Sequence, residues 1–307
     1  MGHFVIVGIL IIVVTVLSYF GVNIMWVLPV SASAQAVPID WLWDVQMMVM
    51  SFLFALIVVP MFYSFIAFRR RKGETGDGEH FEGNTKLEII WTVIPLFAVL
   101  AVAYIGADNL AQVRRADPEA MVVKVTGIQW SWRFDYPDYG VTSTELYLPE
   151  GKQVLLQMTS NDVIHSFWVP EFRVKQDLVP GRITELRITP TIIGDYKVSC
   201  AELCGTSHAY MINPVKVTTQ EDFDAWMVVK VAEALEASQT PEGRGQALVA
   251  ANGCAACHSI NGAAGIGPTW FGLAGSEVEL SGGATVIADD AFLAESILEP
   301  QAKIVAG

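Results

Sequence analysis

Charged residues are scarce in this chain of 307 residues, and three long segments contain none. Charged side chains make up 17% of the sequence, and the mean hydropathy is +0.42. The uncharged segments are residues 4–30, 45–68 and 89–107. A helix needs about 20 apolar residues to cross a bilayer, and each segment is near or above that length. The sequence therefore predicts three transmembrane helices rather than buried core helices.

The first uncharged segment lacks the basic residues that usually precede the apolar part of a signal peptide. SASAQA at 31–36 offers small-residue cleavage sites, so a cleaved signal is one interpretation. The apolar run is much longer than the usual stretch of about 7–15 residues, which favours a retained anchor. We expect residues 1–36 to form a transmembrane helix, as an anchor or as a signal.

A run of four basic residues, Arg69, Arg70, Arg71 and Lys72, directly follows the second uncharged segment. Lys and Arg concentrate on the cytoplasmic side of membrane spans. The loop that follows should therefore lie inside the cell, and the chain after the third segment outside. A merely solvated loop is the weaker interpretation, because the run borders an apolar span.

Basic residues are fewer than acidic ones, with 19 Lys and Arg against 32 Asp and Glu and a net charge of −13. Residues 212–307 hold much of the excess, with 12 acidic and 4 basic side chains. An acidic exported surface does not suit nucleic acid. It suits a basic protein partner through electrostatic steering, or it serves solubility alone.

No internal repeat is visible, but the character of the chain changes after the third apolar segment. Short runs rich in β-branched and aromatic residues, separated by Gly and Pro, predict an antiparallel sandwich or barrel. The candidate strands are residues 121–126, 129–135, 153–159, 183–189, 196–200 and 213–218.

The last hundred residues predict helices instead. Residues 221–237 form the first, followed by a polar linker, SQTPEG, at 238–243. Thr240 is a candidate N-cap with Pro241 in the first turn, and a later helix begins at Asp289 or Asp290 and stops at Pro300. The expected domains are 1–36, 37–110, 111–220 and 241–307, with a linker helix at 221–240.

Cysteine is scarce as well, with four in the whole chain. Disulfides are the first expectation for an exported protein. Here the cysteines form two tight pairs, C-x3-C and C-x2-C, and a histidine closely follows each pair. This arrangement favours metal or cofactor sites over disulfides.

The first pair lies in CAELCGTSHAYM, residues 200–211, which also contains His208 and Met211. Sulfur and imidazole ligands suit copper or zinc, and methionine is unusual at structural zinc. One blue copper site needs a single Cys, so the second cysteine allows two copper ions. The histidines at 3 and 80 fall on the inner side and 258 follows the other pair, which leaves His165 as the second imidazole. A Cys200–Cys204 disulfide is the alternative.

The pattern C-x-E-x-C-x3-H-x2-M resembles the binuclear CuA signature of cytochrome c oxidase subunit II. The similarity covers most of residues 40–217, including LEIIWTVIP (87–95), GIQWSWRFDYPDYG (127–140) and SNDVIHSFWVPEFRVKQDLVPGR (160–182). The resemblance implies a cupredoxin-like domain that binds a copper pair. It implies that Cys200 and Cys204 bridge both ions, that His165 and His208 bind one each, that Met211 is a weak ligand, and that Glu202 binds through its backbone carbonyl.

The same resemblance implies roles outside the copper ligands. The Glu202 side chain would reach a magnesium ion shared with subunit I, and magnesium prefers such oxygen donors. Trp130 would accept electrons, or is merely a packed sandwich residue; its neighbour Ser131 stands where relatives often have an aromatic. Glu88 would lie at the mouth of a proton path into subunit I, or is an interfacial carboxylate without a role. Asp162 and Asp177 match acidic positions that lie, in the family, near the loop of copper ligands and near the partner interface.

The second pair lies in GCAACHS, residues 253–259, which contains C-x2-C-H. In haem c, Cys254 and Cys257 would form thioether bonds and His258 would bind the iron. A redox dithiol is the alternative. GIGPTWFGLAG (265–275) and AFLAESILEP (291–300) resemble class I cytochromes c, which implies that Pro268 supports the histidine.

The sequence lacks a distal haem ligand of the usual kind. The last methionine is Met227, and no histidine follows His258. In the family, a run similar to PQAKIVAG precedes the segment with the methionine, so we expect the 241–307 domain to be incomplete at its C-terminus. The alternative is an open iron or one bound by Lys303.

The predicted fold is a membrane-anchored multi-domain chain with transmembrane α-helices, a cupredoxin-like β-barrel or sandwich, and a small all-α class I cytochrome c domain. The resemblance implies subunit II of a haem–copper cytochrome c oxidase in a bacterial inner membrane, with the copper and haem domains on the periplasmic side. Electrons would pass from a donor through haem c and the copper pair to haem in subunit I, which reduces dioxygen to water and pumps protons. The expected partners are subunits I and III and either cytochrome c or a quinol-oxidising complex.

Two other functions stay open, a subunit of a CuA-containing nitric oxide reductase and a membrane-tethered electron carrier without an oxidase. Glu88 and the carboxylate of Glu202 argue against the free carrier, because both have roles only beside a catalytic subunit. A quinol oxidase subunit II is excluded by the complete set of copper ligands.

Overall fold

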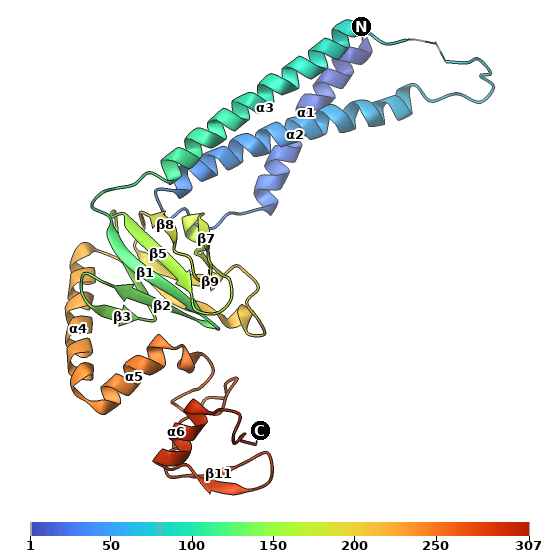
Figure 1. Cartoon of the computed structure of the whole chain (residues 1–307). Coiled ribbons are helices and arrows are strands. Elements are labelled where there is room, and N and C mark those ends of the chain that lie inside the picture. The colour runs from blue at the N-terminus through green and yellow to red at the C-terminus, as the bar shows by residue number, and fades with distance from the viewer. Residues whose placement is uncertain (1, 79, 81, 307) are drawn as a thin grey trace. The chain divides into compact units, whose positions relative to one another are not determined.

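The computed structural model describes residues 2–78, 80 and 82–306. Its first compact unit contains three long helices, α1 (Gly2–Met25), α2 (Ala36–Ala67) and α3 (Thr85–Val113) (Figure 1). All three are long and apolar enough to cross a membrane, which agrees with the three predicted spans. Helix α2 begins within SASAQA, so the expected boundary after residue 36 falls in its first turn.

Helix α1 packs along α2. The buried side chains in the membrane part of α2 are Met47, Ser51, Ala55 and Val59. They recur every four residues and therefore share one face of the helix. Two of the four are small, and small residues allow helix backbones to approach closely in a membrane.

The segment between α1 and α2 is folded rather than loose. We call residues 29–35 the N-terminal strap. Within it, the Ala32 N–H donates to Glu171 O at 2.9 Å, and Ala32 O accepts from the Thr191 N–H at 3.0 Å. Ala32 and Ser33 are both fully buried. The strap is therefore built into the first unit, which also includes residues 170–174 and 187–191.

Arg173 fastens the strap and the start of α2 together. Its Nε donates to Asp40 Oδ1 at 2.7 Å and its Nη2 donates to Asp40 Oδ2 at 3.2 Å. The guanidinium also donates to Pro170 O at 2.9 Å and to Pro29 O. Arg173 has φ of +62°, a left-handed conformation that costs a residue with a Cβ about 1–2 kcal/mol.

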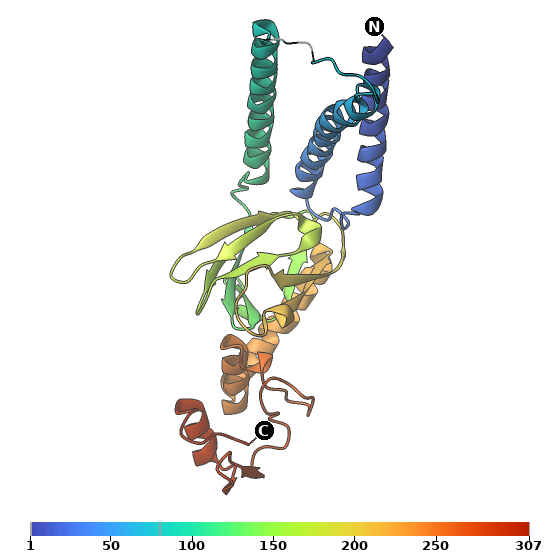
Figure 2. The same ribbon diagram turned by 90° about the vertical axis from the view of Figure 1, so that its right-hand side faces the viewer.

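Two five-stranded sheets dominate the second unit, and both can be followed in Figures 1 and 2. One sheet has the order β3-β2-β1-β5-β8, with strands Val141–Ser143, Ser131–Tyr136, Met121–Ile128, Val154–Ser160 and Thr184–Ile188. The other has the order β4-β10-β9-β6-β7, with strands Leu146–Pro149, Ile212–Thr218, Gly194–Cys200, His165–Trp168 and Lys175–Leu178.

The register departs in two places from the antiparallel sandwich that the sequence predicts. Strand β1 pairs with β5 in parallel, and β4 pairs with β10 in parallel. Alternate residues of β2 and β5 are buried, as expected for strands with one face on a core. Trp132, Phe134, Leu156, Met158 and Phe167 are fully buried in this unit. The result is the expected cupredoxin-like domain.

Helix α4 (Gln220–Gln239) follows the sandwich and packs against β3, β4 and β10 (Figure 2). Its Trp226 ring stacks on Tyr147, with the ring centroids 4.1 Å apart. Helix α5 (Pro241–Ala251) begins almost at once, with Thr240 Oγ1 accepting from the Gly243 N–H at 3.0 Å. The predicted cap at Thr240, with Pro241 in the first turn, is therefore confirmed. The predicted polar linker at 238–243 is wrong, because only Thr240 separates the two helices.

The final segment contains a 3-10 turn, η3 (Cys254–Ala256), and helix α6 (Asp290–Leu298). Asp289 caps α6 by accepting from the Phe292 N–H at 2.8 Å. Of the two predicted starting residues, Asp289 and Asp290, the first is therefore the cap. Beside these lies a two-stranded hairpin of β11 (Glu277–Glu279) and β12 (Thr285–Ile287). The described residues thus add a small sheet to the all-α unit expected here.

Candidate metal centre

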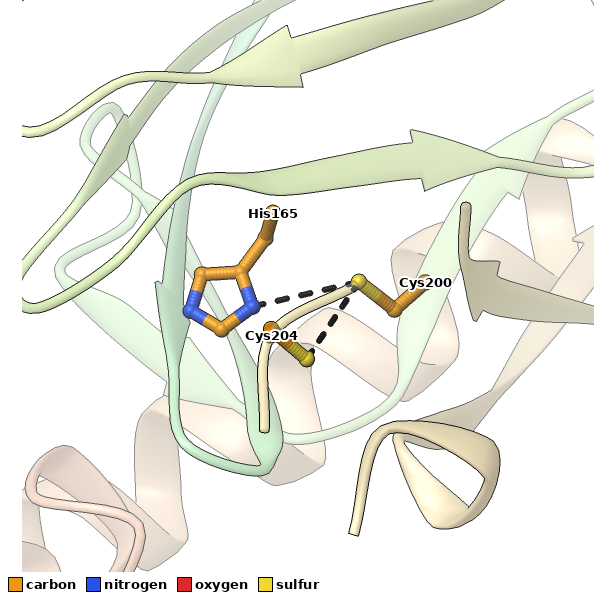
Figure 3. A group of neighbouring side chains, drawn as sticks. All are labelled: His165, Cys200 and Cys204. Atoms are coloured by element: carbon orange, nitrogen blue, oxygen red, sulfur yellow. Dashed lines mark hydrogen bonds between the residues drawn. The ribbon is translucent and has the colours of Figure 1, made fainter. Parts of the chain in front are cut away.

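Two cysteine sulfurs form the middle of a cluster inside the sandwich. His165 lies on β6, Cys200 ends β9, and Cys204 lies in the following loop. His165 Nδ1 is 3.9 Å from Cys200 Sγ, and the two sulfurs are 3.7 Å apart (Figure 3). A disulfide has an S–S distance of about 2.05 Å, so this distance rules out the alternative of a Cys200–Cys204 bridge. Both thiols are free.

The other three predicted donors surround the same sulfurs. His208 Nδ1 is 3.4 Å and Met211 Sδ 3.8 Å from Cys204 Sγ. The backbone oxygen of Glu202 is 3.2 Å from Cys200 Sγ. Two thiols, two imidazoles, one thioether and one carbonyl therefore converge on one place. Thiolate, imidazole and thioether donors are the set that copper prefers in proteins.

Backbone hydrogen bonds shape the copper loop, residues 200–211. The Cys200 N–H donates to Met211 O at 3.1 Å, which closes the loop on itself. The Ala201 N–H donates to Ser166 O at 2.9 Å and holds the loop against the strand of His165. Gly205 has φ of +121°, a conformation that residues with a Cβ rarely adopt. Met211 is fully buried at the end of the loop.

Asp162 holds the His165 ring from the side opposite the sulfurs. Its Oδ1 is 2.8 Å from His165 Nε2, and its Oδ2 accepts from the Gln129 N–H at 2.7 Å. Burial raises the pKa of the Asp162 carboxyl, but hydrogen bonds from Gln129, His165 and Val163 outweigh burial and hold the pKa below its ordinary value. A carboxylate on the second ring nitrogen of a metal-binding histidine fixes the tautomer and ring orientation.

The two thiols differ in acidity. Burial acts to raise the pKa of Cys200, but hydrogen bonds with His165, with backbone groups of Glu202 and Ser166 and with Cys204 together outweigh burial and lower the pKa. Burial and the neighbouring Cys200 charge both raise the pKa of Cys204. Without a bound cation, the pair therefore favours one thiolate and one thiol. A metal ion that binds both sulfurs must displace the remaining proton.

Sequence reasoning missed two residues beside the cluster. A Cβ on Gly127 would lie 2.8 Å from Cδ2 of His165, so only glycine leaves room for the ring. Gln129 Nε2 donates to Cys204 O at 2.7 Å. Both belong to the segment GIQWSW, in which the family resemblance assigns a role to Trp130 alone. Their own roles depend on contacts with the copper loop, which lies far along the chain.

Three of the remaining candidates belong to the same unit as the cluster, and one belongs to the other unit. Trp130 Nε1 donates to Cys204 O at 3.1 Å, so this indole contacts the copper loop directly. The side chain of Glu202 is exposed beside the cluster, and Asp177 is exposed on β7, opposite Ser166. Glu88 is exposed in the first turn of α3 and belongs to the first unit.

The second motif forms a compact turn. The His258 N–H donates to Cys254 O at 3.1 Å, and Cys257 is free, as are the other cysteines. His258 Nδ1 is 2.8 Å from Pro268 O, which leaves Nε2 as the nitrogen for iron. Gly267 permits this approach, because a Cβ there would lie 2.6 Å from Cε1 of His258. The residues therefore fit covalent haem with a proximal histidine.

Lys303, the alternative iron ligand, is engaged elsewhere. Its Nζ is 2.6 Å from Glu295 Oε2 and lies 6.0 Å from the centre of the Phe292 ring. The Lys303 amine would have to leave this ion pair before it could bind an iron. The described contacts thus do not support this alternative.

Comparisons with known proteins follow the same division of the chain. The model of the cytochrome c oxidase subunit II transmembrane domain matches residues 21–106, and that of its periplasmic domain matches residues 141–219. Cytochrome c oxidase subunit 2 of Thermostichus vulcanus is 35% identical over 268 residues, which cover 70% of this chain and 82% of the relative. The protein of the same name from Alkalihalophilus pseudofirmus is 36% identical and covers 76% of this chain and 72% of that relative.

A solved structure is similar to part of this chain. The periplasmic domain of subunit II of cytochrome oxidase from Bradyrhizobium japonicum is 32% identical, with a TM-score of 0.36, over 38% of this chain and 96% of that one. The transmembrane and periplasmic family matches fit a membrane protein with a domain on the outer side. The chain belongs to the cytochrome c oxidase subunit II family and is accordingly a component of a haem–copper oxidoreductase complex, and its own periplasmic domain implies a CuA site.

Proposed function

We propose that this chain receives electrons from a donor through haem c and a copper pair and delivers them to haem in oxidase subunit I. Dioxygen reduction to water and proton pumping take place in that partner. The convergence of His165, Cys200, Cys204, His208 and Met211 with the Glu202 carbonyl is the observation that carries this proposal. A free carrier would need the metal donors but not the exposed carboxylate of Glu202 beside them.

In this proposal each donor keeps the role expected of it. Cys200 and Cys204 would bridge the ions, His165 and His208 would bind one ion each, Met211 would be a weak ligand, and Glu202 would contribute its carbonyl. When bound, the copper pair supplies one-electron transfer. The chain supplies a buried, hydrogen-bonded cage, in which Cys204 is 2% exposed and His165 and Met211 are fully buried. Such a cage limits rearrangement between redox states.

Trp130 is the proposed point where electrons reach the copper domain. The hydrogen bond from its indole N–H to Cys204 O gives a short contact between the turn that joins β1 to β2 and a proposed copper ligand. Cys254 and Cys257 would hold haem c covalently, and His258 would bind its iron with support from Pro268. This assigns residues 111–220 to the copper domain, 221–240 to a linker helix and 241–307 to a cytochrome c domain.

The partners follow from the exposed groups. The Glu202 carboxylate would bind a magnesium ion shared with subunit I. Glu88, at the inner end of α3, would open a proton path into that subunit. Subunit III completes the complex, and either cytochrome c or a quinol-oxidising complex is the donor. The protein would pass three times through a bacterial inner membrane, with residues 1–36 and the hairpin of 37–110 as spans and both redox domains in the periplasm.

Electron paramagnetic resonance combined with metal analysis tests the proposal on the purified, detergent-solubilised chain. We expect a hyperfine pattern from two equivalent copper ions together with haem iron. His208→Ala should lose the copper pattern and keep the haem, whereas His80→Ala on the inner side should keep both. A single-copper pattern, or zinc in place of copper, would contradict the ligand assignment.

A further inference from the structure

The imidazole of His258 has an aromatic partner that the haem motif does not require. The Trp270 ring stacks on it with centroids 4.9 Å apart and an interplanar angle of 13°. Phe271, the next residue, is 67% exposed. The contact is therefore specific to one of two adjacent aromatic side chains.

The backbone around the stacked pair is fixed by hydrogen bonds. The Trp270 N–H donates to Ser259 O at 2.7 Å, directly beside His258. Thr269 Oγ1 donates to the same Ser259 oxygen at 3.0 Å and lies 2.8 Å from Ser259 Oγ. With the contact between Pro268 O and His258 Nδ1, each residue of the segment 268–270 bonds to His258 or to its neighbour Ser259. Both rings are thus held in place by the chain and not only by each other.

The stack bears on the redox state of an iron bound to His258. Ferric iron draws more electron density from its imidazole ligand than ferrous iron does, so the ring is more positive in the oxidised state. The face of an indole carries negative charge and attracts a positive group above it. Trp270 therefore stabilises the ferric state more than the ferrous state, which favours electron release.

We propose that Trp270 is a positioning residue for the proximal histidine and that its stacked ring lowers the midpoint potential of the haem. The inference rests on the proposed haem c. It concerns how readily that haem passes its electron onward, which the motif Cys254, Cys257 and His258 leaves open.

The test compares four full-length chains produced with haem c maturation: wild type, Trp270→Leu, Trp270→Phe and Phe271→Leu. Covalent haem per chain is measured first, and the haem midpoint potential is then measured by spectroelectrochemical titration. For Trp270→Leu we expect roughly a threefold higher ratio of reduced to oxidised haem at a fixed potential, an upward shift of about 28 mV at 59 mV per tenfold change. Trp270→Phe should lie close to wild type, and Phe271→Leu should match it.

Each outcome decides a separate point. Equal potentials in wild type and Trp270→Leu, or an equal shift in Phe271→Leu, would overturn the role of Trp270 and leave the haem assignment intact. A wild-type chain without covalent haem would overturn the haem assignment and this inference with it. If Trp270→Leu does not take up haem, Trp270→Met supplies the same comparison with a flexible apolar side chain.

Discussion

At the scale of single residues, the absence of a Cβ at Gly127 leaves room for one side chain of the copper cluster. Gly127 lies on β1, in register with Trp132 on one side and Ser160 on the other, so its backbone cannot move away easily. His165 fills the space where a Cβ would stand. The strand and the ligand thus share a contact that only glycine allows.

Gly127→Ala should displace the His165 ring and weaken copper binding. The added methyl group would lie 2.8 Å from Cδ2 of the ring, which is closer than real Cβ contacts allow. We expect lower copper content and an altered hyperfine pattern in electron paramagnetic resonance. Gly282→Ala is the control, because nothing lies within 4 Å of a Cβ there. Wild-type copper content and spectrum in Gly127→Ala would contradict the packing argument.

Asp162→Asn should weaken copper binding without removing a ligand. The amide offers one acceptor oxygen where the carboxylate bonds both His165 Nε2 and the Gln129 N–H. Loss of such an outer partner typically costs about 10–100-fold in metal affinity. Titration of copper against a competing chelator measures the change. Asp177→Asn, an exposed carboxylate on β7, should bind copper as wild type does, and an equal loss in both variants would count against orientation by Asp162.

At the scale of elements, the N-terminal strap depends on an arginine in an unfavourable conformation. Arg173→Ala keeps the left-handed backbone cost but loses the bonds to Asp40, Pro29 and Pro170. Arg173→Gly loses the same bonds but removes that cost of about 1–2 kcal/mol. We expect Arg173→Ala to lower the free energy of unfolding by roughly 1–3 kcal/mol, with Arg173→Gly between it and wild type.

Thermal unfolding in detergent, followed by circular dichroism, ranks the three proteins. Arg182→Ala, on an exposed turn of the second unit, controls for the loss of a surface arginine. Unchanged stability in Arg173→Ala would show that the strap does not depend on this side chain.

The elements that could be predicted from sequence are those with a strong local pattern. The long apolar helices and the strands β1, β5 and β10 carry enough consecutive signal to be recognised. Strands β3, β4, β6 and β7 have only three or four residues each, too few for a period of two to stand out. The parallel pairings depend on contacts between distant segments and have no local signature.

The grouping of the six proposed copper donors could be predicted for a related reason. Five of them lie in twelve consecutive residues, and His165 was left once the other histidines were placed. Gly127 and Gln129 are different, because their roles exist only after the strand β1, the ligand strand and the copper loop meet. Asp162 is matched by the family resemblance, but its bond to His165 is visible only in the fold. Local chemistry thus identifies ligands, and only the fold identifies what orients them.

At the scale of the whole molecule, the structure bears on whether α1 is retained. Signal-type cleavage within SASAQA would remove Ala32, the residue of the strap that bonds to both Glu171 and Thr191. The family match to the transmembrane domain also begins at residue 21, ahead of this segment. Intact-mass spectrometry of the protein extracted from membranes should therefore find residues 1–36 present. A mature N-terminus at Gln35 or Val37 would contradict this and identify α1 as a signal.

The strap also has a consequence for biogenesis. Its hydrogen-bonding partners at 170–174 and 187–191 are synthesised long after the strap itself emerges from the ribosome. The strap must remain unpaired while α2, α3 and most of the copper domain are made and exported. Strand β6 with His165 also precedes these partners in the chain, and Cys200 follows them. Chain order thus allows the strap to close before the last copper ligands leave the translocation channel, and so before the metal cage can be completed.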